Sequence, residues 1–470
     1  MIFNSIQYAM FLPVVLAGYW ALRRSHRNQN ILLLIASYVF YGAWDYRFLS
    51  LLALSTVTDY LVGLRLAKEK EERRRKVWLG ISLFVNLGIL AFFKYFGFFV
   101  DSARVLLEGM GLVPNPPLLD VLLPVGISFY TFQTISYTFD IYRRRIEPTT
   151  SLIDFGVYVA YFPQLVAGPI ERARHLLPQI TRARSITAER LGSGVLLILL
   201  GLFKKVAIAD VMAGIATEVF LDAPNEGALS LLVGLYAFSL QIYGDFSGYT
   251  DIARGSSRLL GIELMENFRQ PYLSRNITEF WRTWHISLSN WLRDYLYIPL
   301  GGNRQGRLKT YRNLMLTMLL GGLWHGAAWT FVFWGGLHGL YLTAHRRFRS
   351  RATDEPAPRR PSDLWRTLAT FHLVALSWIF FRAENFTQAT SYLRGILTWR
   401  EGVVLEGHLA RVLLALIVIV TIDLWQRNSG TELFFARWNP AARGAAYAAM
   451  LIAIVLFSGG RPTPFIYFRF

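Results

Sequence analysis

The chain has 470 residues, of which 53% are hydrophobic, 15% aromatic and only 17% charged. This composition excludes an ordinary water-soluble enzyme and predicts an all-α, polytopic membrane protein. The formal charge of +18 comes largely from arginines in short loops between apolar segments, which indicates membrane topology and contact with anionic lipid, and no nucleic-acid partner. The absence of cysteine excludes disulfides, thiolate metal sites and a cysteine nucleophile.

The first apolar segment predicts a membrane span that stays in the protein. No basic residue precedes residues 6–22, Arg23, Arg24 and Arg27 follow them, and no small-residue cleavage site is present. These features are unlike those of a cleaved signal peptide. Because cytoplasmic loops are enriched in arginine and lysine, we expect the N-terminus outside and the loop at 23–30 inside the cell.

Four further apolar segments predict spans of alternating direction. Basic runs at 65–76 and 143–145 place two of the connecting loops in the cytoplasm, and the loop that contains Pro114 to Pro117 is then external. The four segments are residues 31–43, 47–64, 78–97 and 121–142.

The middle of the chain is less regular. Apolar stretches at 152–168, 193–215 and 228–250 are interrupted by glycine, proline and charged residues, so we expect broken elements that line a cavity. Apolar segments follow at 314–342, 364–381, 408–425 and 443–459. The total is about ten to twelve membrane helices, with interfacial or re-entrant helices around a central cavity.

We expect one membrane domain over residues 1–470. It comprises N-terminal helices at 1–145, a core at 150–345, a basic, proline-rich cytoplasmic linker at 346–363, and C-terminal helices at 364–470.

A histidine lies in the middle of the apolar run at 314–337. His325 is the only ionisable side chain in this run, which is long enough to cross a bilayer as one helix. The imidazole would then lie near the midplane, where titratable groups are rare and usually face a polar cavity. The alternative is a neutral histidine that only hydrogen-bonds a neighbouring helix.

A second histidine lies on a segment that resembles an amphipathic interfacial helix, residues 276–300. Apolar side chains recur there at three-to-four spacing, and Asn276 with Glu279 predicts an N-terminal cap. His285 follows Trp284 as His325 follows Trp324, so the two histidines could divide the roles of base and substrate positioner. The alternative is an interfacial histidine without a chemical role.

Polar side chains also gather in two apolar stretches. Within 239–254, buried carboxylates are costly unless paired, and we expect Arg254 or Arg282 to pair them in a structural network. The stretch at 162–172 joins a bent backbone to Glu171 and Arg172, and a cytoplasmic hinge is an equal alternative.

Several common catalytic motifs are absent from the sequence. It contains no phosphate-binding GxxxxGK[ST], no GxSxG and no HExxH, and its eight histidines lack metal-ligand spacing. The sequence therefore predicts neither an ATPase, a serine hydrolase nor a zinc protease, and no metal.

Five long motifs resemble the membrane-bound O-acyltransferase (MBOAT) family. Within it, the chain is similar to the bacterial branch of alginate O-acetyltransferases, with teichoic-acid D-alanylation and peptidoglycan O-acetylation proteins as relatives. The motifs are FQTISYTFDIYR (132–143), FPQLVAGPIER (162–172), DFSGYTDIARG (245–255), FWRTWHISLSNWLRDYLYIPLGGNR (280–304) and GGLWHGAAWTFVFWGGLHG (321–339).

The resemblance implies that His325 is the catalytic histidine and His285 the second active-site position. It implies a multi-pass protein of the bacterial inner membrane, where a cytosolic thioester meets an acceptor hydroxyl. Burial disfavours imidazolium, so we expect His325 to be neutral and able to take the proton of that hydroxyl. Candidate substrate-binding residues lie beside the histidines or in the polar stretch: Trp324, Trp284, Ser289, Asn290, Arg293, Tyr243, Asp245 and Gln241.

The implied reaction needs no bound cofactor. The donor would be acetyl-CoA or an acyl-carrier thioester, and the acceptor an exported polysaccharide of the alginate type or a periplasmic acetyltransferase partner. The alternative is a transporter or polymer-export channel with His325 as a proton relay, although no inverted repeat supports it. A passive membrane scaffold would leave the buried histidine unexplained.

Overall fold

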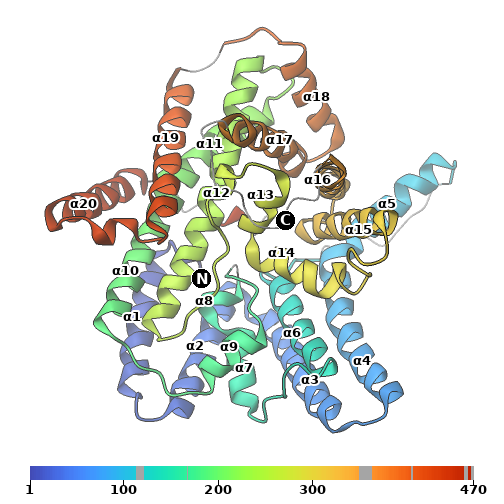
Figure 1. The fold of residues 1–470 in the computed structure, drawn as a ribbon, viewed down its shortest axis with the longest axis vertical. Coiled ribbons are helices and arrows are strands. Elements are labelled where there is room, and N and C mark those ends of the chain that lie inside the picture. Colours follow the sequence, from blue (N-terminus) through green and yellow to red (C-terminus); the bar gives the residue numbers. More distant parts are fainter. Residues whose placement is uncertain (113–120, 167, 349–362, 404–405, 460–463, 467–470) are drawn as a thin grey trace. The chain divides into compact units, whose positions relative to one another are not determined.

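The computed structural model describes residues 1–112, 121–166, 168–348, 363–403, 406–459 and 464–466. Every regular element within these ranges is helical (Figure 1), which confirms the all-α prediction. The proline loop at 114–117, which we expect to be external, and most of the 346–363 linker lie outside the described residues. The chain divides into a first compact unit, Met1–Val195 with Ala253–Met265, and a second, Leu196–Ile252 with Glu266–Phe470.

The helices of the first unit follow the predicted segments closely. Ser5 and Ser25 accept hydrogen bonds from Tyr8 N and Asn28 N, so each begins a helix as an N-cap. The elements are α1 (Ile6–Ala21), α2 (His26–Asp45), η1 (Tyr46–Phe48), α3 (Leu49–Lys68), α4 (Glu72–Leu90), the π-helix η2 (Ala91–Tyr95), α5 (Phe96–Gly109), α6 (Ile127–Tyr142), α7 (Leu152–Ala160), α8 (Phe162–Leu165), α9 (Ala173–Ile180) and most of α10 (Ala188–Leu202).

One arginine of the basic run at 65–76 is structural. Arg75 is only 2% exposed, and its guanidinium donates to the Leu66 carbonyl at the end of α3 and to the Ile141 and Tyr142 carbonyls at the end of α6. The last carbonyls of a helix have no partner within it, and a cation there also complements the helix dipole. Arg75 therefore joins two helix ends.

The predicted break within 152–168 is confirmed. Helix α7 ends at Ala160, and the short α8 follows in a new direction. Gly168 approaches the backbone so closely that a Cβ built there would lie 2.5 Å from Gln164 Cα. The buried Glu171 accepts hydrogen bonds from His175 Nδ1 (2.7 Å) and from Met265 N (2.7 Å), so this stretch is tied into the unit.

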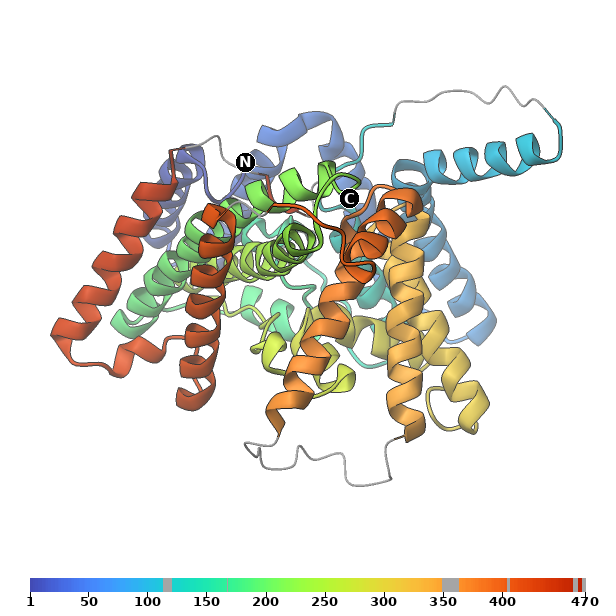
Figure 2. The ribbon, with the colours of Figure 1, turned by 90° about the horizontal axis from the view of Figure 1, so that it is seen from above.

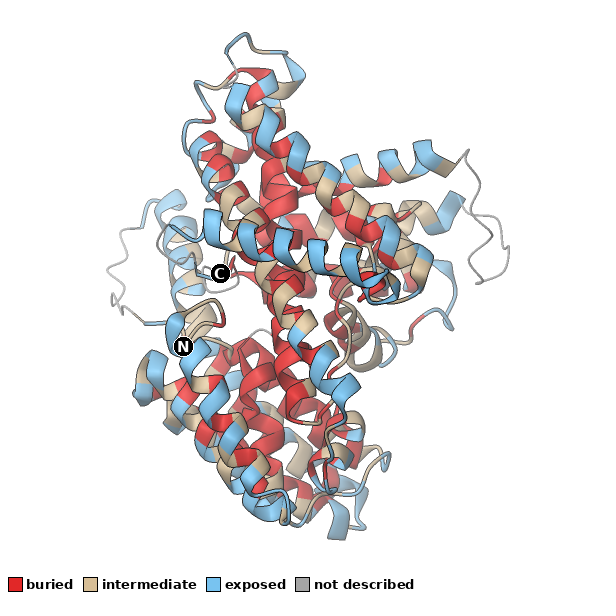
Figure 3. Cartoon of the chain, turned by 90° about the vertical axis from the view of Figure 1, so that its left-hand side faces the viewer, coloured by how far each residue is buried: buried red, intermediate tan, exposed pale blue. Residues whose placement is uncertain are grey.

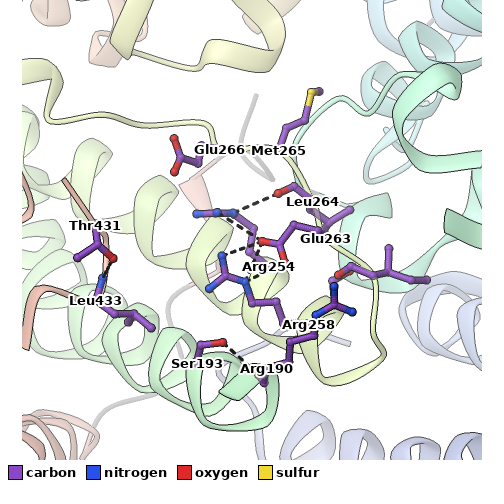
Figure 4. Close-up of polar contacts among 12 residues, drawn as sticks. Arg190, Ser193, Arg254, Arg258, Glu263, Leu264, Met265, Glu266, Thr431 and Leu433 are labelled. Carbon is purple, nitrogen blue, oxygen red and sulfur yellow. Dashed lines mark hydrogen bonds and ion pairs between the residues drawn. The ribbon is translucent and has the colours of Figure 1, made fainter. Parts of the chain in front are cut away.

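The arginine predicted to pair with the carboxylates of 239–254 has other partners. Figure 4 shows the Arg254 guanidinium beside the Leu264 carbonyl (3.4 Å) and the Glu263 carboxylate (3.9 Å). Arg258 pairs more closely with Glu263, at 2.7 Å. These contacts hold the chain after α12 against the end of that helix.

The second unit holds the remaining helices. They are the end of α10, the π-helix η3 (Phe203–Ala209), α11 (Asp210–Leu221), α12 (Ala228–Leu259, whose last residues belong to the first unit), η4 (Pro271–Leu273), α13 (Ile277–Thr283), α14 (Ile286–Leu292), the π-helix η5 (Arg293–Tyr297), α15 (Arg307–His325), α16 (Trp329–Phe348), α17 (Leu364–Arg382), α18 (Phe386–Leu397), α19 (Glu406–Ser429), η7 (Phe434–Arg437) and α20 (Pro440–Phe457).

The expectation of a broken element at 228–250 is wrong, because α12 runs unbroken for 32 residues. Its glycines serve close packing instead. A Cβ on Gly248 would lie 2.7 Å from the Gly201 carbonyl oxygen, and one on Gly201 would lie 2.5 Å from the Gly248 carbonyl oxygen. Small residues let membrane helices approach closely, so these glycines bring α12 against η3.

The apolar run at 314–337 forms two helices and not the single span that we expected. Helix α15 ends at His325, and α16 begins at Trp329 and packs back along α15. Cβ atoms on Gly322 and Gly335 would collide with the carbonyls of Phe331 and Met318 on the facing helix. These glycines permit a tight hairpin with His325 beside its tip.

Six stretches have the length and apolar composition of membrane spans among the described residues, which confirms a multi-pass membrane protein. Two of these stretches each contain two helices, α2 with α3 and α4 with α5, so the six stretches are not a count of membrane helices. Figure 2 shows α19 and α20 as separate rods, and Figure 3 shows buried residues on inward helix faces and exposed ones on outward faces. The six are His26–Lys68, Glu72–Gly109, Ala228–Leu259, Leu364–Arg382, Glu406–Ser429 and Pro440–Phe457.

Candidate active site

His285 occupies a sharp turn between two short helices. The expectation of one helix over 276–300 is therefore wrong, although Asn276 does cap its start by accepting from Glu279 N at 2.9 Å. His285 has a φ of 42° and a ψ of 56°, in the left-handed region. This conformation costs about 1–3 kcal/mol for a residue other than glycine and persists only where its surroundings enforce it.

The enforcing contacts come from Asn267, which precedes the turn in the sequence. Its backbone carbonyl accepts from Ile286 N at 3.0 Å, and its side-chain oxygen accepts from Ser287 N at 3.2 Å. These are free N–H groups of the first turn of α14, which otherwise need a cap. Asn267 thus starts α14 and holds the backbone of His285 in its unusual conformation.

His325 is fixed by rings on three sides. It is the last residue of α15 and is 3% exposed. The ring of Trp334 on α16 meets it edge to face at 5.2 Å between centroids, Phe381 on α17 lies at 5.4 Å, and Trp324 at 5.1 Å. These contacts hold the imidazole in place, and none of the three neighbouring rings carries a formal charge.

The two imidazoles lie together, with ring centroids 6.3 Å apart. His285 is completely buried, and Phe246 of α12 covers it at 4.6 Å. Burial lowers the pKa of His285 to about 3, so this imidazole is neutral at physiological pH and has one donor and one acceptor nitrogen. We call His285, His325, Trp324, Trp334, Phe246 and Phe381 the histidine site.

The other predicted residues near the histidines differ in position. Trp324 contacts both imidazoles, with ring centroids 6.0 Å from His285 and 5.1 Å from His325. Trp284 points into a separate cluster of rings, where it packs on Trp378 at 5.2 Å. Ser289 donates to the Trp284 carbonyl at 3.1 Å and so stabilises the turn, and Asn290 is half-buried on the same helix.

Three predicted substrate-binding residues pair with side chains outside the histidine site, and a fourth is buried on α12. The Arg293 guanidinium is 57% exposed and pairs with Asp294 at 2.8 Å, and the Tyr243 hydroxyl donates to Asp423 at 2.8 Å. Asp245 pairs with Lys205 at 2.7 Å, and Gln241 is buried on α12. Their assignment to substrate binding stays a prediction.

Two lysines that the sequence interpretation did not consider pair with the buried carboxylates of α12. Lys204 pairs with Asp251 at 2.8 Å, and Lys205 pairs with both Asp245 (2.7 Å) and Asp210 (2.8 Å). Both lysines lie in the π-helix η3, whose extra residue per turn changes the direction of the side chains. We call these five residues the lysine network.

A third buried histidine was missed by the sequence interpretation. His338 on α16 is fully buried, and its ring lies 4.8 Å from Trp334, which in turn contacts His325. The only sequence signal was its place in the apolar continuation of the run that holds His325. Within the described ranges, no group of three or more His, Cys, Asp or Glu side chains could hold a metal ion.

Comparison with known proteins agrees with this geometry. The model of the membrane-bound O-acyltransferase family matches residues 143–382. The chain belongs to this family. The match contains both histidines of the site and the whole α15–α16 hairpin, so this MBOAT protein is an acyltransferase.

Curated relatives of this MBOAT protein include several O-acetyltransferases. A probable alginate O-acetylase of Pseudomonas aeruginosa is 47% identical over 83% of this chain and 73% of its own length. The peptidoglycan O-acetyltransferase of Helicobacter pylori is 37% identical over 82% of this chain and 78% of its own length. The teichoic acid D-alanyltransferase of Bacillus subtilis is 28% identical over 58% of this chain and 72% of its own length.

Proposed function

We propose that this MBOAT protein transfers an acetyl group from a cytosolic thioester towards the hydroxyls of an exported polysaccharide, of the alginate type. One observation carries the proposal: two buried imidazoles lie 6.3 Å apart between aromatic rings, in a chain of an acyltransferase family. The alginate O-acetylase name of the relatives supports the acetyl group and the acceptor class.

In the proposed reaction, His325 acts as the general base. Its imidazole takes the proton of the acceptor hydroxyl while the oxygen attacks the thioester carbonyl carbon. The C–S bond then breaks, the thiolate leaves, and the imidazolium returns the proton to it, so that an ester and a free thiol are formed. A thioester is already activated, and the protein has to supply the base, the orientation and stabilisation of the oxyanion.

His285 would orient the reacting groups. As a neutral imidazole it offers one N–H to the thioester carbonyl or to the acceptor oxygen. A spacing of 6.3 Å between ring centroids leaves room for one reacting centre that hydrogen-bonds to both rings. Asn267 holds the left-handed turn through the two backbone N–H groups that follow His285, and this fixes the point from which the imidazole extends.

The donor would approach from the cytoplasm and the acceptor from outside. The first turns of α4 present exposed basic side chains, among them Arg73, Arg74 and Lys76, to an anionic coenzyme A or carrier protein. We propose the bacterial inner membrane as the location, an external N-terminus, and a periplasmic acetyltransferase as a possible recipient of the acetyl group.

The test is thiol release by the purified protein in detergent. Because the chain has no cysteine, a thiol reagent detects only the thiol freed from acetyl-CoA or from an acetylated carrier protein. We expect thioester-dependent thiol release that alginate oligosaccharides accelerate, with radiolabelled acetate recovered on the sugar.

The matched variant is His325→Ala. General-base catalysis contributes about 100- to 10,000-fold, so this variant should lose nearly all activity while its thermal unfolding stays near that of the parent. A folded His325→Ala protein that keeps more than about a tenth of the activity would exclude His325 as the base. No thiol release from either donor would contradict the proposed function itself.

A further inference from the structure

The buried His338 takes part in a chain of hydrogen bonds with a single direction. The indole N–H of Trp281 donates to His338 Nδ1 at 3.2 Å, and His338 Nε2 lies 2.9 Å from Ser377 Oγ. Ser377 Oγ donates its own proton to the Val374 carbonyl at 2.6 Å. Four groups on three helices are therefore connected through one imidazole.

The chemistry of the two end groups fixes the tautomer of His338. An indole nitrogen can only donate, so Nδ1 has to be the acceptor. The Ser377 hydroxyl has one proton, which it gives to Val374, so it accepts from Nε2–H. His338 is thus a neutral imidazole with its proton on Nε2, and both nitrogens are used, which leaves neither for an acceptor or donor substrate.

The three helices joined by His338 are those that build the histidine site. Trp281 lies on α13, four residues before His285, and His338 lies on α16, which forms the hairpin with the helix of His325. Ser377 lies on α17, which also carries Phe381 against the His325 ring. A change at His338 therefore acts on both histidines through their supporting helices.

Trp334 connects His338 with His325 by direct ring contacts. Its ring contacts His338 at 4.8 Å on one side and His325 at 5.2 Å on the other, and it stacks on Trp378 at 5.5 Å with an interplanar angle of 17°. Rings packed in this way have few alternative positions. The orientation of the His325 ring thus depends on where His338 holds Trp334.

We propose that His338 is a positioning residue for acyl transfer, which sets the separation and orientation of His285 and His325 by joining α13, α16 and α17. This inference rests on the proposed function, since it assumes that His325 is the base. A displacement of about 1 Å at a reacting centre can cost about 100-fold in rate, so loss of the hydrogen bonds should lower kcat far more than it raises KM.

The test compares His338→Leu with His338→Gln in the thiol-release assay with acetyl-CoA or the acetylated carrier protein. Leucine fills the space without hydrogen bonds, whereas glutamine retains an acceptor for Trp281 and a donor for Ser377. We expect kcat of His338→Leu to fall about 10- to 100-fold with KM within about threefold of the parent, and His338→Gln to recover most of the loss. Rescue by glutamine distinguishes hydrogen-bonded positioning from simple packing.

Trp281→Phe is the second variant, because it retains the ring and removes only the donor. It should reproduce the kcat loss in part, and the double variant with His338→Leu should lose no more than His338→Leu alone. If His338→Leu does not fold, Trp281→Phe against the parent decides the question by the same criterion.

The inference is overturned if folded His338→Leu keeps kcat within about threefold of the parent, or if His338→Gln is no better than His338→Leu. Its failure is distinct from failure of the proposed function. If His325→Ala is inactive and His338→Leu is unaffected, only the positioning role of His338 is excluded. If His325→Ala is active, the assignment of His325 as the base is excluded, and the positioning role rests on that assignment.

Discussion

The histidine site and the lysine network meet at neighbouring residues of α12, yet one buries uncharged rings and the other buries paired charges. Phe246 covers His285 at 4.6 Å, while the adjacent Asp245 pairs with Lys205 at 2.7 Å. The histidine site consists of neutral rings, and the network consists of full charges that neutralise one another. Because consecutive helix residues point in different directions, one helix can serve both without bringing a fixed charge onto the reaction site.

This difference predicts different failures. A buried charge that loses its partner destabilises the folded protein, whereas a buried neutral ring whose loss leaves the packing intact affects mainly the reaction. Variants of the lysine network should therefore unfold more easily, and variants of the histidine site should stay folded and lose turnover. Among all these variants, we expect His325→Ala to cause the largest loss of turnover.

The largest expected effect on stability is that of Lys205→Met. Lys205 is 2% exposed and pairs with two carboxylates, so its removal takes a cation away from Asp210 and from the buried Asp245. Breaking a buried pair in this way costs about 3–5 kcal/mol. Thermal unfolding in detergent, followed by tryptophan fluorescence, should show a large fall in the midpoint of Lys205→Met. Lys205→Arg keeps the positive charge, so its midpoint should fall less. An unchanged midpoint for Lys205→Met would contradict the distinction between the two regions.

His285→Ala should affect turnover and leave stability nearly unchanged. We expect a loss of about 10- to 100-fold, smaller than that of His325→Ala, because one orienting hydrogen bond is removed and the base stays. Asparagine tolerates the left-handed backbone and can donate, so His285→Asn should be more active than His285→Ala. The double variant with His325→Ala should be no worse than His325→Ala alone, since residues that act as a unit are non-additive. Additive losses would show that the two histidines act separately.

Salt should act on the approach of the donor and not on the neutral histidine site. Replacing Arg73, Arg74 and Lys76 together by glutamine should lower kcat/KM for acetyl-CoA about three- to tenfold at low salt, at the lower end of electrostatic steering. The difference should disappear above about 0.5 M salt, where the Debye length is only a few ångströms. Arg104→Gln on α5, on the side that we expect to be external, is the matched control. An equal effect of this control would contradict the proposed sidedness.

The smallest expected effect concerns a partly exposed ion pair in the first unit. The hydrogen bond to Glu171 raises the pKa of His175 above its ordinary value, against the opposing effect of burial. A raised pKa in the folded state gives stability that is complete below about pH 6.5 and is lost as the pH rises through the folded value. His175→Gln should therefore lower the unfolding midpoint at pH 6 and leave it almost unchanged at pH 8.5. The His175 side chain is 39% exposed, so we expect less than about 1 kcal/mol.

The sequence was sufficient for the fold class and for the two histidines, but not for the backbone around them. Hydropathy and basic loops predicted α1 to α4 and α6, because helices of this length bury or expose apolar side chains along their whole length, whereas α5 lies where we expected an external loop. The hairpin beside His325 was missed, because an apolar sequence that contains glycines such as Gly322 and Gly335 is compatible both with one straight span and with two tightly packed helices. The closeness of the two imidazoles follows from the resemblance and from paired Trp-His sequences, not from spacing along the chain.

Two other errors have a common physical origin. We expected Arg254 or Arg282 to neutralise the carboxylates of α12 and missed Lys204 and Lys205, which the π-helix η3 directs to them. π-Helical geometry leaves no clear mark in composition. The left-handed turn at His285 was read as continuous helix, because the contact that enforces it comes from Asn267, outside the periodic pattern. Tertiary contacts of this kind cannot be inferred from local sequence alone.

The position of His325 at the very end of α15 has an electrostatic consequence. The last carbonyls of a helix carry a partial negative charge, equivalent to about half an elementary charge, and cations near them are stabilised by about 0.3–1 kcal/mol at exposed sites and more where water is excluded. His325 would become a cation only during proton transfer. The helix terminus then acts as a built-in counterion for the imidazolium, next to the uncharged rings of Trp334 and Phe381.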